Sequence, residues 1–155
     1  MERSLKNVDI YTDGACTGNP GPGGYAAVLL YNGRQKEFSG GDAHTTNNRM
    51  ELLACITGLS ALKEPCRVNL YSDSKYVVDG VEKGWARRWK KNGWMRNKNE
   101  KALNADLWEQ LLMLLDEHAV RFYWVKGHDD NPLNELCDTN ARAAARAAAD
   151  MPADN

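Results

Sequence analysis

The order of strand-like and helix-like segments constrains the fold of this chain more than any other feature. Three runs with strand-like patterns come first, at residues 7–13, 24–31 and 34–41. A meander followed by alternating elements predicts an α/β fold, in which helices flank one five-stranded mixed sheet of three antiparallel strands with parallel additions. The expected alternating elements are helices at 48–63, roughly 74–91, 104–117 and 134–149, and strands at 67–73 and 119–126.

Turn residues and helix-end residues mark several boundaries. Asp13-Gly14 is expected to end the first strand, and Asn32-Gly33 is expected to join the next two strands as a hairpin. Asn104 is a candidate N-cap for the helix that follows it. Trp108 and Trp124 fall on amphipathic elements, so both are expected in the core.

The length predicts a single domain over residues 1–155, with an ordered core over about 7–149 and a frayed tail at 150–155. The N-terminal segment lacks an apolar leader, and the longest apolar runs, at 26–31 and 111–115, are too short to cross a bilayer. The four cysteines form no CxxC pair, which favours reduced thiols. We therefore expect a cytoplasmic monomer with no membrane association and no obligate protein partner.

Charge is distributed unevenly along the chain. The net charge is only −1, but residues 82–101 carry eight Lys or Arg against two Glu. This basic segment is therefore +6, and the remainder of the chain is −7. Trp85, Trp89 and Trp94 lie among these cations, and flat apolar surface beside positive charge is typical of nucleic-acid binding. The alternative is that these tryptophans belong to the core and the cations form a solvated helix face.

Four acidic residues stand where predicted elements begin or end: Asp13, Glu51, Asp73 and Asp138. The strands that end at two of them are expected to lie side by side, and open α/β sheets place their sites at such an edge. Carboxylates gathered at one place repel one another unless cations neutralise them. Oxygen ligands without a His or Cys cluster favour a hard ion, Mg2+ or Mn2+.

Each acid also has a purely structural interpretation. Asp13-Gly14 is a common turn pair, and Asn48-x-x-Glu51 has the spacing of a capping box. Asp73 could cap a helix, and Asp138 could favour the first turn of one. The joint occurrence of all four at expected element ends favours a shared site over four separate structural uses.

Six phrases carry a family resemblance: TDGACTGNPGPGGY, TTNNRMEL, SDSKYV, WARRWKKNGW, WVKGH and NELCDTNARAAA. In this order, over about residues 7–149, the chain resembles the bacterial type 1 ribonucleases H, which cut the RNA strand of RNA/DNA hybrids. The resemblance implies a ribonuclease H-like fold with a basic protrusion, and it maps the metal-binding acids of the family onto the four acids above.

The same resemblance implies two-metal-ion hydrolysis with Mg2+, for which Mn2+ is a possible substitute, and products with 5′-phosphate and 3′-hydroxyl ends. Asp13 would be the bridging ligand. The loop residue His128 matches a family histidine that assists proton transfer or product release, although a structural role is the alternative.

Substrate contacts are implied residue by residue. Small polar residues near the acids suit the recognition of 2′-hydroxyls, and the basic segment suits the DNA strand. Asn134 is explained nearly as well as an N-cap. Lys75, Leu30 and His44 depart from the family pattern, so the contacts at these positions are open. The implied set is Cys16, Asn19, Thr46, Asn47, Asn48, Lys75, Trp85, Trp89, Lys90, Lys91 and Asn134.

Two functions of different classes therefore compete. The first is a metal-dependent endonuclease that hydrolyses the RNA strand of RNA/DNA hybrids. The second is a noncatalytic module that binds such hybrids and uses its acids structurally. The presence of a carboxylate in all four motifs favours the enzyme.

Overall fold

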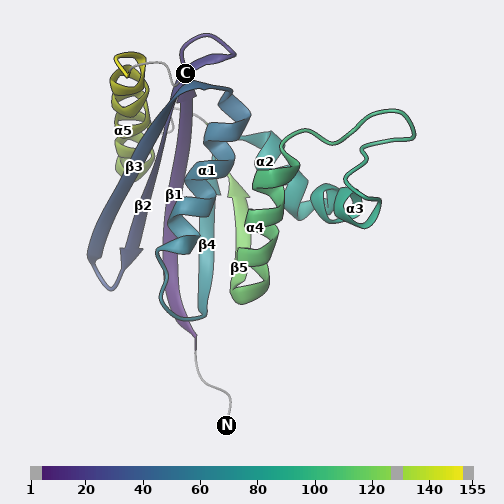
Figure 1. The fold of residues 1–155 in the computed structure, drawn as a ribbon. Helices are drawn as coiled ribbons and strands as arrows, with labels where there is room; N and C mark the ends of the chain where they lie inside the picture. The colour runs from purple at the N-terminus through teal and green to yellow at the C-terminus, as the bar shows by residue number, and fades with distance from the viewer. Residues whose placement is uncertain (1–4, 127–130, 152–155) are drawn as a thin grey trace.

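The computed structural model describes residues 5–126 and 131–151, which form a five-stranded sheet in the order β3-β2-β1-β4-β5 (Figure 1). The predicted fold class, one mixed sheet flanked by helices, is confirmed. The strands are β1 (Lys6–Cys16), β2 (Gly21–Tyr31), β3 (Arg34–Thr45), β4 (Cys66–Ser72) and β5 (Ala119–Trp124). The helices are α1 (Asn47–Ser60), α2 (Lys75–Glu82), α3 (Trp85–Lys91), α4 (Ala105–Glu117) and α5 (Pro132–Ala149).

Strand β1 joins the antiparallel and parallel halves of the sheet. Ile10 pairs with Leu29 of β2 in the antiparallel direction and with Leu70 of β4 in the parallel direction. Strand β5 pairs in parallel with β4 and forms one edge. Because β1 and β4 run parallel, their C-terminal ends lie at the same end of the sheet. Asp13 and Asp73 are found at this end.

The sheet is covered on both faces. Alternate residues of β1 and β4, such as Val8, Ile10 and Val68, are buried in the larger core with residues of α1 and α4. Helix α5 lies on the opposite face, where Ala26 and Val28 pack against Cys137 and other α5 residues in a smaller core. Figure 1 shows α1 and α4 on one side of the sheet and α5 on the other.

Helix α5 approaches the sheet closely because both sides carry small residues. A Cβ on Gly24 of β2 would lie 2.3 Å from the carbonyl oxygen of Ala141 and 2.4 Å from the backbone nitrogen of Ala145. Glycine is therefore required at this position for steric reasons. The contact sets the position of α5 and of Asp138, which this helix carries.

Several predicted boundaries are corrected by the structure. Strand β1 does not end at Asp13-Gly14 but continues to Cys16, because Asp13 pairs with Ala26 and Gly14 with Tyr25. The helical pattern at 74–91 is divided into α2 and α3 by Gly84, whose φ of 75° breaks the helix.

Predictions about three particular residues have different outcomes: Asn104 and Trp108 lie where they were expected, and Trp124 does not. Asn104 occupies the N-cap position of α4, but its side chain makes no capping hydrogen bond and contacts other helices instead. Trp108 is fully buried as expected, whereas Trp124 is 45% exposed because it ends the edge strand β5.

Among the described residues, no helix has the length and apolar character needed to span a membrane. Helix α3 and the segment after it project from the body of the protein beside α2 and α4 (Figure 1). They belong to the basic segment 82–101, and we call this part the basic protrusion. The predicted protrusion thus extends to one side of the sheet edge that carries the acids.

Candidate metal centre and nucleic-acid interface

Three carboxylates from three different elements meet at the edge of the sheet. Oxygen atoms of Asp13, Glu51 and Asp73 lie within 4.8 Å of one another. Asp13 belongs to β1, Glu51 to the second turn of α1, and Asp73 to the junction between β4 and α2. The carboxyl groups of Asp13 and Glu51 are almost fully buried, whereas Asp73 is exposed to solvent.

The backbone of Gly14 holds the two buried carboxylates together. Its N–H donates to Oδ1 of Asp13 at 2.8 Å and to Oε1 of Glu51 at 3.0 Å. A Cβ at Gly14 would lie 2.7 Å from the backbone nitrogen of Glu51, so a larger residue would separate β1 from α1. Glycine at this position therefore allows the helix to bring its carboxylate onto the strand.

The structural alternatives for these acids do not hold. Asp13 is in a paired strand and not in a turn. Helix α1 is capped by Thr46, whose Oγ1 accepts from the Arg49 N–H, and α2 is capped by Ser74. Glu51 is therefore not part of a capping box, and Asp73 is not an N-cap. Their proximity has to be explained by something other than helix termination.

Burial and mutual repulsion change the protonation of this cluster. Burial raises the pKa of Asp13 to about 8, and the negative charges of Asp73 and Asp138 act in the same direction. Burial also raises the pKa of Glu51 well above its ordinary value, again with help from Asp73 and Asp13. A positive ion among these oxygens would oppose both shifts, because it would favour the ionised carboxylates.

Glu51 provides a specific test of whether a metal ion fits. Its Oε2 atom is buried and has no hydrogen-bond partner within residues 5–126 and 131–151. A buried carboxylate oxygen without a partner is costly, and it points to a missing ligand. Oxygen-only donors from Asp and Glu suit a hard divalent cation such as Mg2+ or Mn2+. The residues present therefore fit a divalent metal.

Asp138 lies beside this cluster and not in its centre. It stands in the second turn of α5, since that helix begins at Pro132, so the first-turn interpretation is wrong. Its negative charge is close enough to Asp13 to help raise the pKa of that carboxyl group. Oδ2 of Asp138 accepts from Arg142 at 2.5 Å. The structure thus gathers Asp13, Glu51 and Asp73 in one cluster, and Asp138 acts on that cluster through its charge.

Two of the predicted RNA-contacting loops touch each other next to the acids. Oδ1 of Asn19 accepts from the Asn47 N–H at 3.0 Å, which ties the β1–β2 loop to the start of α1. Asn48 follows on the same helix, and Thr46 caps it. The thiol of Cys16 donates to the carbonyl oxygen of Gly18 at 2.8 Å. These small polar groups form one surface along the N-terminus of α1.

The other residues predicted near the acids are Lys75, Asn134 and His128. The Lys75 ammonium lies 4.7 Å from the ring centre of Trp124, whose Nε1–H donates to the carbonyl oxygen of Asp73. Asn134 is not the N-cap of α5, because Asn131 fills that role and accepts from the Asn134 N–H. His128 lies outside the described residues.

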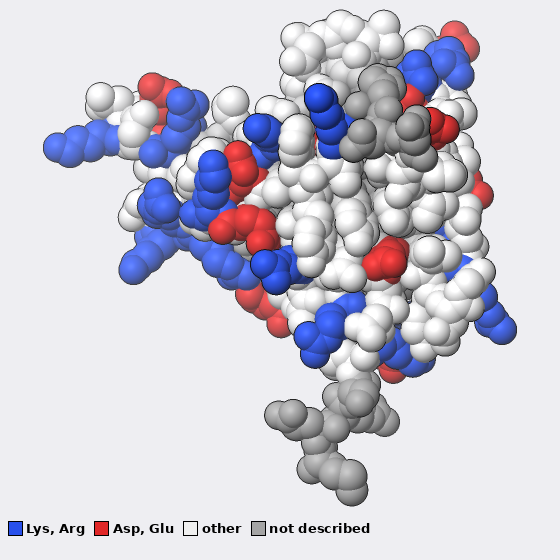
Figure 2. Space-filling model, turned by 180° about the vertical axis from the view of Figure 1, so that it is seen from behind, with Lys and Arg blue, Asp and Glu red and all other residues white. Residues whose placement is uncertain are grey.

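The basic protrusion contains a pocket of about 410 Å³. Its aromatic walls include Trp85 and Trp89, and Trp89 packs edge-on against the buried Trp108. Lys90 forms an ion pair with Glu109 at 3.8 Å, while Lys91 is exposed. Figure 2 shows Lys and Arg gathered over this projecting part of the molecule. Trp89 therefore fits both interpretations, because it packs against the core and lines the pocket, whereas Trp94 packs against the core and Trp85 lines the pocket.

Several residues at these sites were not singled out by the sequence. Tyr76 and Leu103 complete the pocket beside Arg88 and Arg96 of the basic segment, and Arg142 binds Asp138. The i,i+4 spacing of Arg142 and Asp138 is a local signal that could have identified this pair. Tyr76 and Leu103 had no comparable signal, since the pocket forms only when α2 and α3 pack beside the segment before α4.

The chain is similar to known proteins over nearly its whole length. The RNase H family model matches residues 5–146. A ribonuclease H of Desulforamulus reducens is 64% identical over 143 residues, which cover 92% of this chain and 90% of that protein. A ribonuclease H of Rippkaea orientalis is 56% identical over 156 residues, which cover 99% of this chain and 94% of that protein.

Solved structures show the same fold. LC9-RNase H1, a type 1 RNase H with the type 2 active-site motif, superposes with a TM-score of 0.83 at 30% identity, covering 95% of this chain and 75% of that one. LC11-RNase H1, solved in complex with an RNA/DNA hybrid, gives a TM-score of 0.68 at 23% identity over 91% and 98% of the two chains. The second likeness shows the fold alone.

Proposed function

The chain belongs to the ribonuclease H family of endoribonucleases, which cut the RNA strand of RNA/DNA hybrids, and we propose that it does so at the cluster of Asp13, Glu51 and Asp73. The observation that carries this proposal is the buried, unpartnered Oε2 of Glu51 within a group of three converging carboxylates. A noncatalytic binding module has no use for such a costly arrangement.

A divalent metal fits this site, and we propose Mg2+, with two ions bound in the presence of substrate and Mn2+ as a possible substitute. When bound, such ions make hydroxide available near neutral pH and stabilise the departing oxygen of a phosphodiester. We propose that Asp13 would be the ligand shared by both ions, since its carboxylate oxygen lies within 4.8 Å of oxygens of both Glu51 and Asp73. Glu51 and Asp73 would supply the outer ligands, and Asp138 the fourth carboxylate.

The reaction then needs few groups besides the ligands. The oxygen of water attacks phosphorus, and the bond from phosphorus to the 3′ oxygen breaks, which leaves 5′-phosphate and 3′-hydroxyl ends. We propose that His128 assists by transferring a proton at the leaving oxygen or by helping product release. No protein side chain becomes covalently attached.

The substrate would be recognised on two surfaces. We propose that Cys16, Asn19, Asn47 and Asn48 contact the 2′-hydroxyl side of the RNA strand. In support, the Asn19–Asn47 hydrogen bond ties the loop after the strand of Asp13 to the start of the helix that carries Glu51. Thr46, Lys75 and Asn134 would support the backbone around the cut position. The DNA strand would lie on the protrusion, held by Trp85, Trp89, Lys90 and Lys91.

We further propose that the protein acts as one domain, as a monomer and in the cytoplasm. The four free cysteines fit a reducing compartment.

The test is cleavage of one labelled sequence prepared as RNA/DNA hybrid, RNA duplex, DNA duplex and single-stranded RNA, with Mg2+ or with chelator. Wild type and Asp13→Asn are compared, with Asp9→Asn as the matched control on the same strand. The expected result is metal-dependent loss of RNA from the hybrid alone, abolished only by Asp13→Asn. Binding without cutting in fresh wild-type protein would support the noncatalytic module instead.

A further inference from the structure

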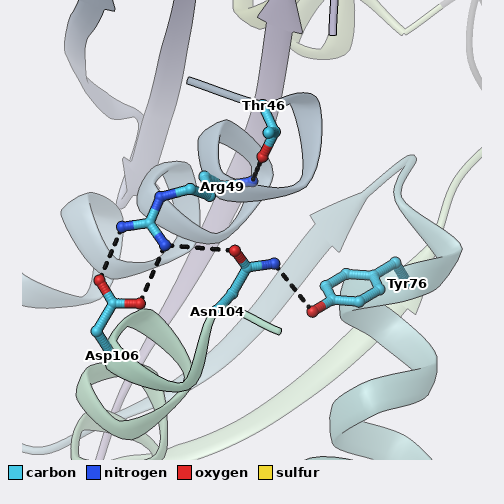
Figure 3. Close-up of polar contacts among 5 residues, drawn as sticks. All are labelled: Thr46, Arg49, Tyr76, Asn104 and Asp106. Atoms are coloured by element: carbon cyan, nitrogen blue, oxygen red, sulfur yellow. Dashed lines mark hydrogen bonds and ion pairs between the residues drawn. The ribbon is translucent and has the colours of Figure 1, made fainter. Parts of the chain in front are cut away.

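A polar network joins three helices next to the acidic cluster, and its centre is Arg49 of α1 (Figure 3). The two terminal nitrogens of Arg49 donate to the two carboxylate oxygens of Asp106 at 3.0 and 2.7 Å. One of them also donates to Oδ1 of Asn104 at 3.3 Å. The guanidinium therefore holds the side chains at the start of α4 in a fixed geometry.

The network continues from Asn104 to α2. The amide nitrogen of Asn104 donates to the Tyr76 hydroxyl at 3.2 Å, and the indole N–H of the buried Trp108 donates to the same hydroxyl at 2.8 Å. Asn104 has a φ of 62° and leaves the N-cap of α4 without a side-chain hydrogen bond. Its side chain bridges Arg49 and Tyr76 instead of capping its own helix.

The two ends of this network stand next to metal-centre residues. Arg49 lies two positions before Glu51 on α1, and Tyr76 lies three positions after Asp73 on α2. The Arg49 N–H is also the group that Thr46 accepts from when it caps α1 (Figure 3). The bridge from Arg49 through Asn104 to Tyr76 thus fixes the spacing between the elements that carry Glu51 and Asp73.

The charge on Arg49 has little value for stability by itself. The side chain of Arg49 is 34% exposed and that of Asp106 is 60% exposed. Surface ion pairs of this kind contribute little to stability, because water screens them. A guanidinium can, however, fork onto one carboxylate and reach a second acceptor, which a lysine ammonium on a flexible stem does not reproduce. The ability of the Arg49 guanidinium to hold Asp106 and Asn104 together therefore explains its presence better than the stability that the ion pair contributes.

We propose that Arg49 is a positioning residue that sets the distance between Glu51 and Asp73, and so the affinity and activity of the metal centre. This inference rests on the proposed function, because it assumes that these carboxylates bind the catalytic metal. Arg49 acts through Asn104 and Tyr76 and touches neither metal nor substrate. Tyr76 and Leu103, the residue before Asn104, also line the protrusion pocket, so the same bridge connects the metal centre to the DNA-strand surface.

The experiment compares wild type with Arg49→Met, Arg49→Lys and Asn104→Gly. Glycine is chosen at position 104 because it tolerates the positive φ while removing the bridging side chain. The control is Lys6→Met, which breaks the comparably exposed Lys6–Glu64 ion pair away from the acids. Three quantities are measured: kcat and KM for hybrid cleavage, the Mg2+ concentration that gives half-maximal cleavage, and the rise in Tm caused by Mg2+ without substrate.

Groups that orient metal ligands typically change affinity or activity by about 10- to 100-fold, so Arg49→Met is expected to lower kcat and raise the Mg2+ requirement by roughly tenfold. KM should change less than kcat. Asn104→Gly should behave in the same way, and Arg49→Lys should fail to restore the wild-type Mg2+ requirement. The Mg2+-induced rise in Tm should shrink in all three variants but not in Lys6→Met.

The proposal is overturned if the variants lose Tm yet keep the wild-type Mg2+ requirement and Mg2+-induced stabilisation, or if Arg49→Lys restores both. If the wild type cleaves normally in that series, only the positioning role of Arg49 is refuted, and the proposed function is retained. A wild type that does not cleave with Mg2+ refutes the proposed function itself. If Arg49→Met does not fold, Arg49→Lys and Asn104→Gly still decide the question.

Discussion

Replacement of Asp13 by asparagine should make the metal-free protein less sensitive to alkaline pH. In the wild type, the folded state raises the pKa of this carboxyl group from 3.8 to about 8, chiefly through burial and then through Asp73 and Asp138. The folded state therefore keeps a proton that the unfolded state has already lost. The contribution of this proton to the free energy of unfolding is fully present below the unfolded pKa of about 4. It falls as pH rises from about 4 to about 8, and above about 8 it changes no further. Asparagine carries no such proton.

The size of the effect follows from this window. One proton that is bound in the folded state alone changes the free energy of unfolding by about 1.4 kcal/mol per pH unit, so between about pH 6 and about pH 8 the wild type should lose roughly 2 to 3 kcal/mol. For a protein of this size, that corresponds to a fall in Tm of roughly 5–10 °C. Glu51 also has a raised pKa, so Asp13→Asn should keep part of the decline.

Thermal unfolding followed by circular dichroism in chelator, at several pH values from about 6 to about 9, measures the difference. Asp9→Asn is the control, because Asp9 lies on the same strand and bonds Asn69 away from the cluster. Addition of Mg2+ should restore most of the wild-type Tm at the alkaline end and have little effect on Asp13→Asn. Parallel pH profiles for wild type and Asp13→Asn would refute the inference that the carboxylates are already gathered before metal binds.

Three further outcomes follow from contacts described above. Lys91→Ala should reduce the slope of log Kd for hybrid binding against log salt by about one, measured by fluorescence anisotropy, and an unchanged slope would place the DNA strand elsewhere. Gly24→Ala should cost about 3 kcal/mol or more in urea unfolding, because the new methyl meets backbone atoms of α5; full stability would contradict that close contact. Trp108→Phe should cost about 2 kcal/mol in the same urea experiment, because the Tyr76 hydroxyl loses a donor and a cavity opens; full stability would contradict both the hydrogen bond and the close packing of the indole.

The sequence predicted helices and strands correctly where the spacing of apolar residues within the element itself indicates its type. Alternation along β1 and β4 identifies strands because their side chains face a core on alternate positions, as Ile10 and Leu70 do. The Gly- and Pro-rich stretch after Asp13 was expected to be a turn from its start. Its first residues instead extend β1, because Gly14 pairs with Tyr25 and Cys16 with Gly23 of β2.

The candidate site was predictable as a set of acids but not as a geometry. Each of the four acids was expected at the start or end of an element, and the topology of a mixed sheet brings such positions together. No sequence pattern indicates that the Gly14 N–H serves two carboxylates, or that Arg49 reaches Asp106, which is 57 residues away. These contacts depend on how helices pack across the sheet. Trp124 was misplaced for the same reason, since only the assembled sheet shows that β5 is an edge.

The packing of α5 on β1 and β2 has a consequence for how the protein is made. Residues 6–60 contain three strands and the helix that covers one of their faces, so this part can begin to fold while the rest is still being synthesised. The other face stays bare until α5 leaves the ribosome, because its partners lie far along the chain; the thiol of Cys137 donates to the carbonyl oxygen of Tyr11 across 126 residues. Asp138 arrives on that same helix. A nascent chain therefore carries three of its acids long before the fourth, and the nuclease is assembled only as its last helix is delivered.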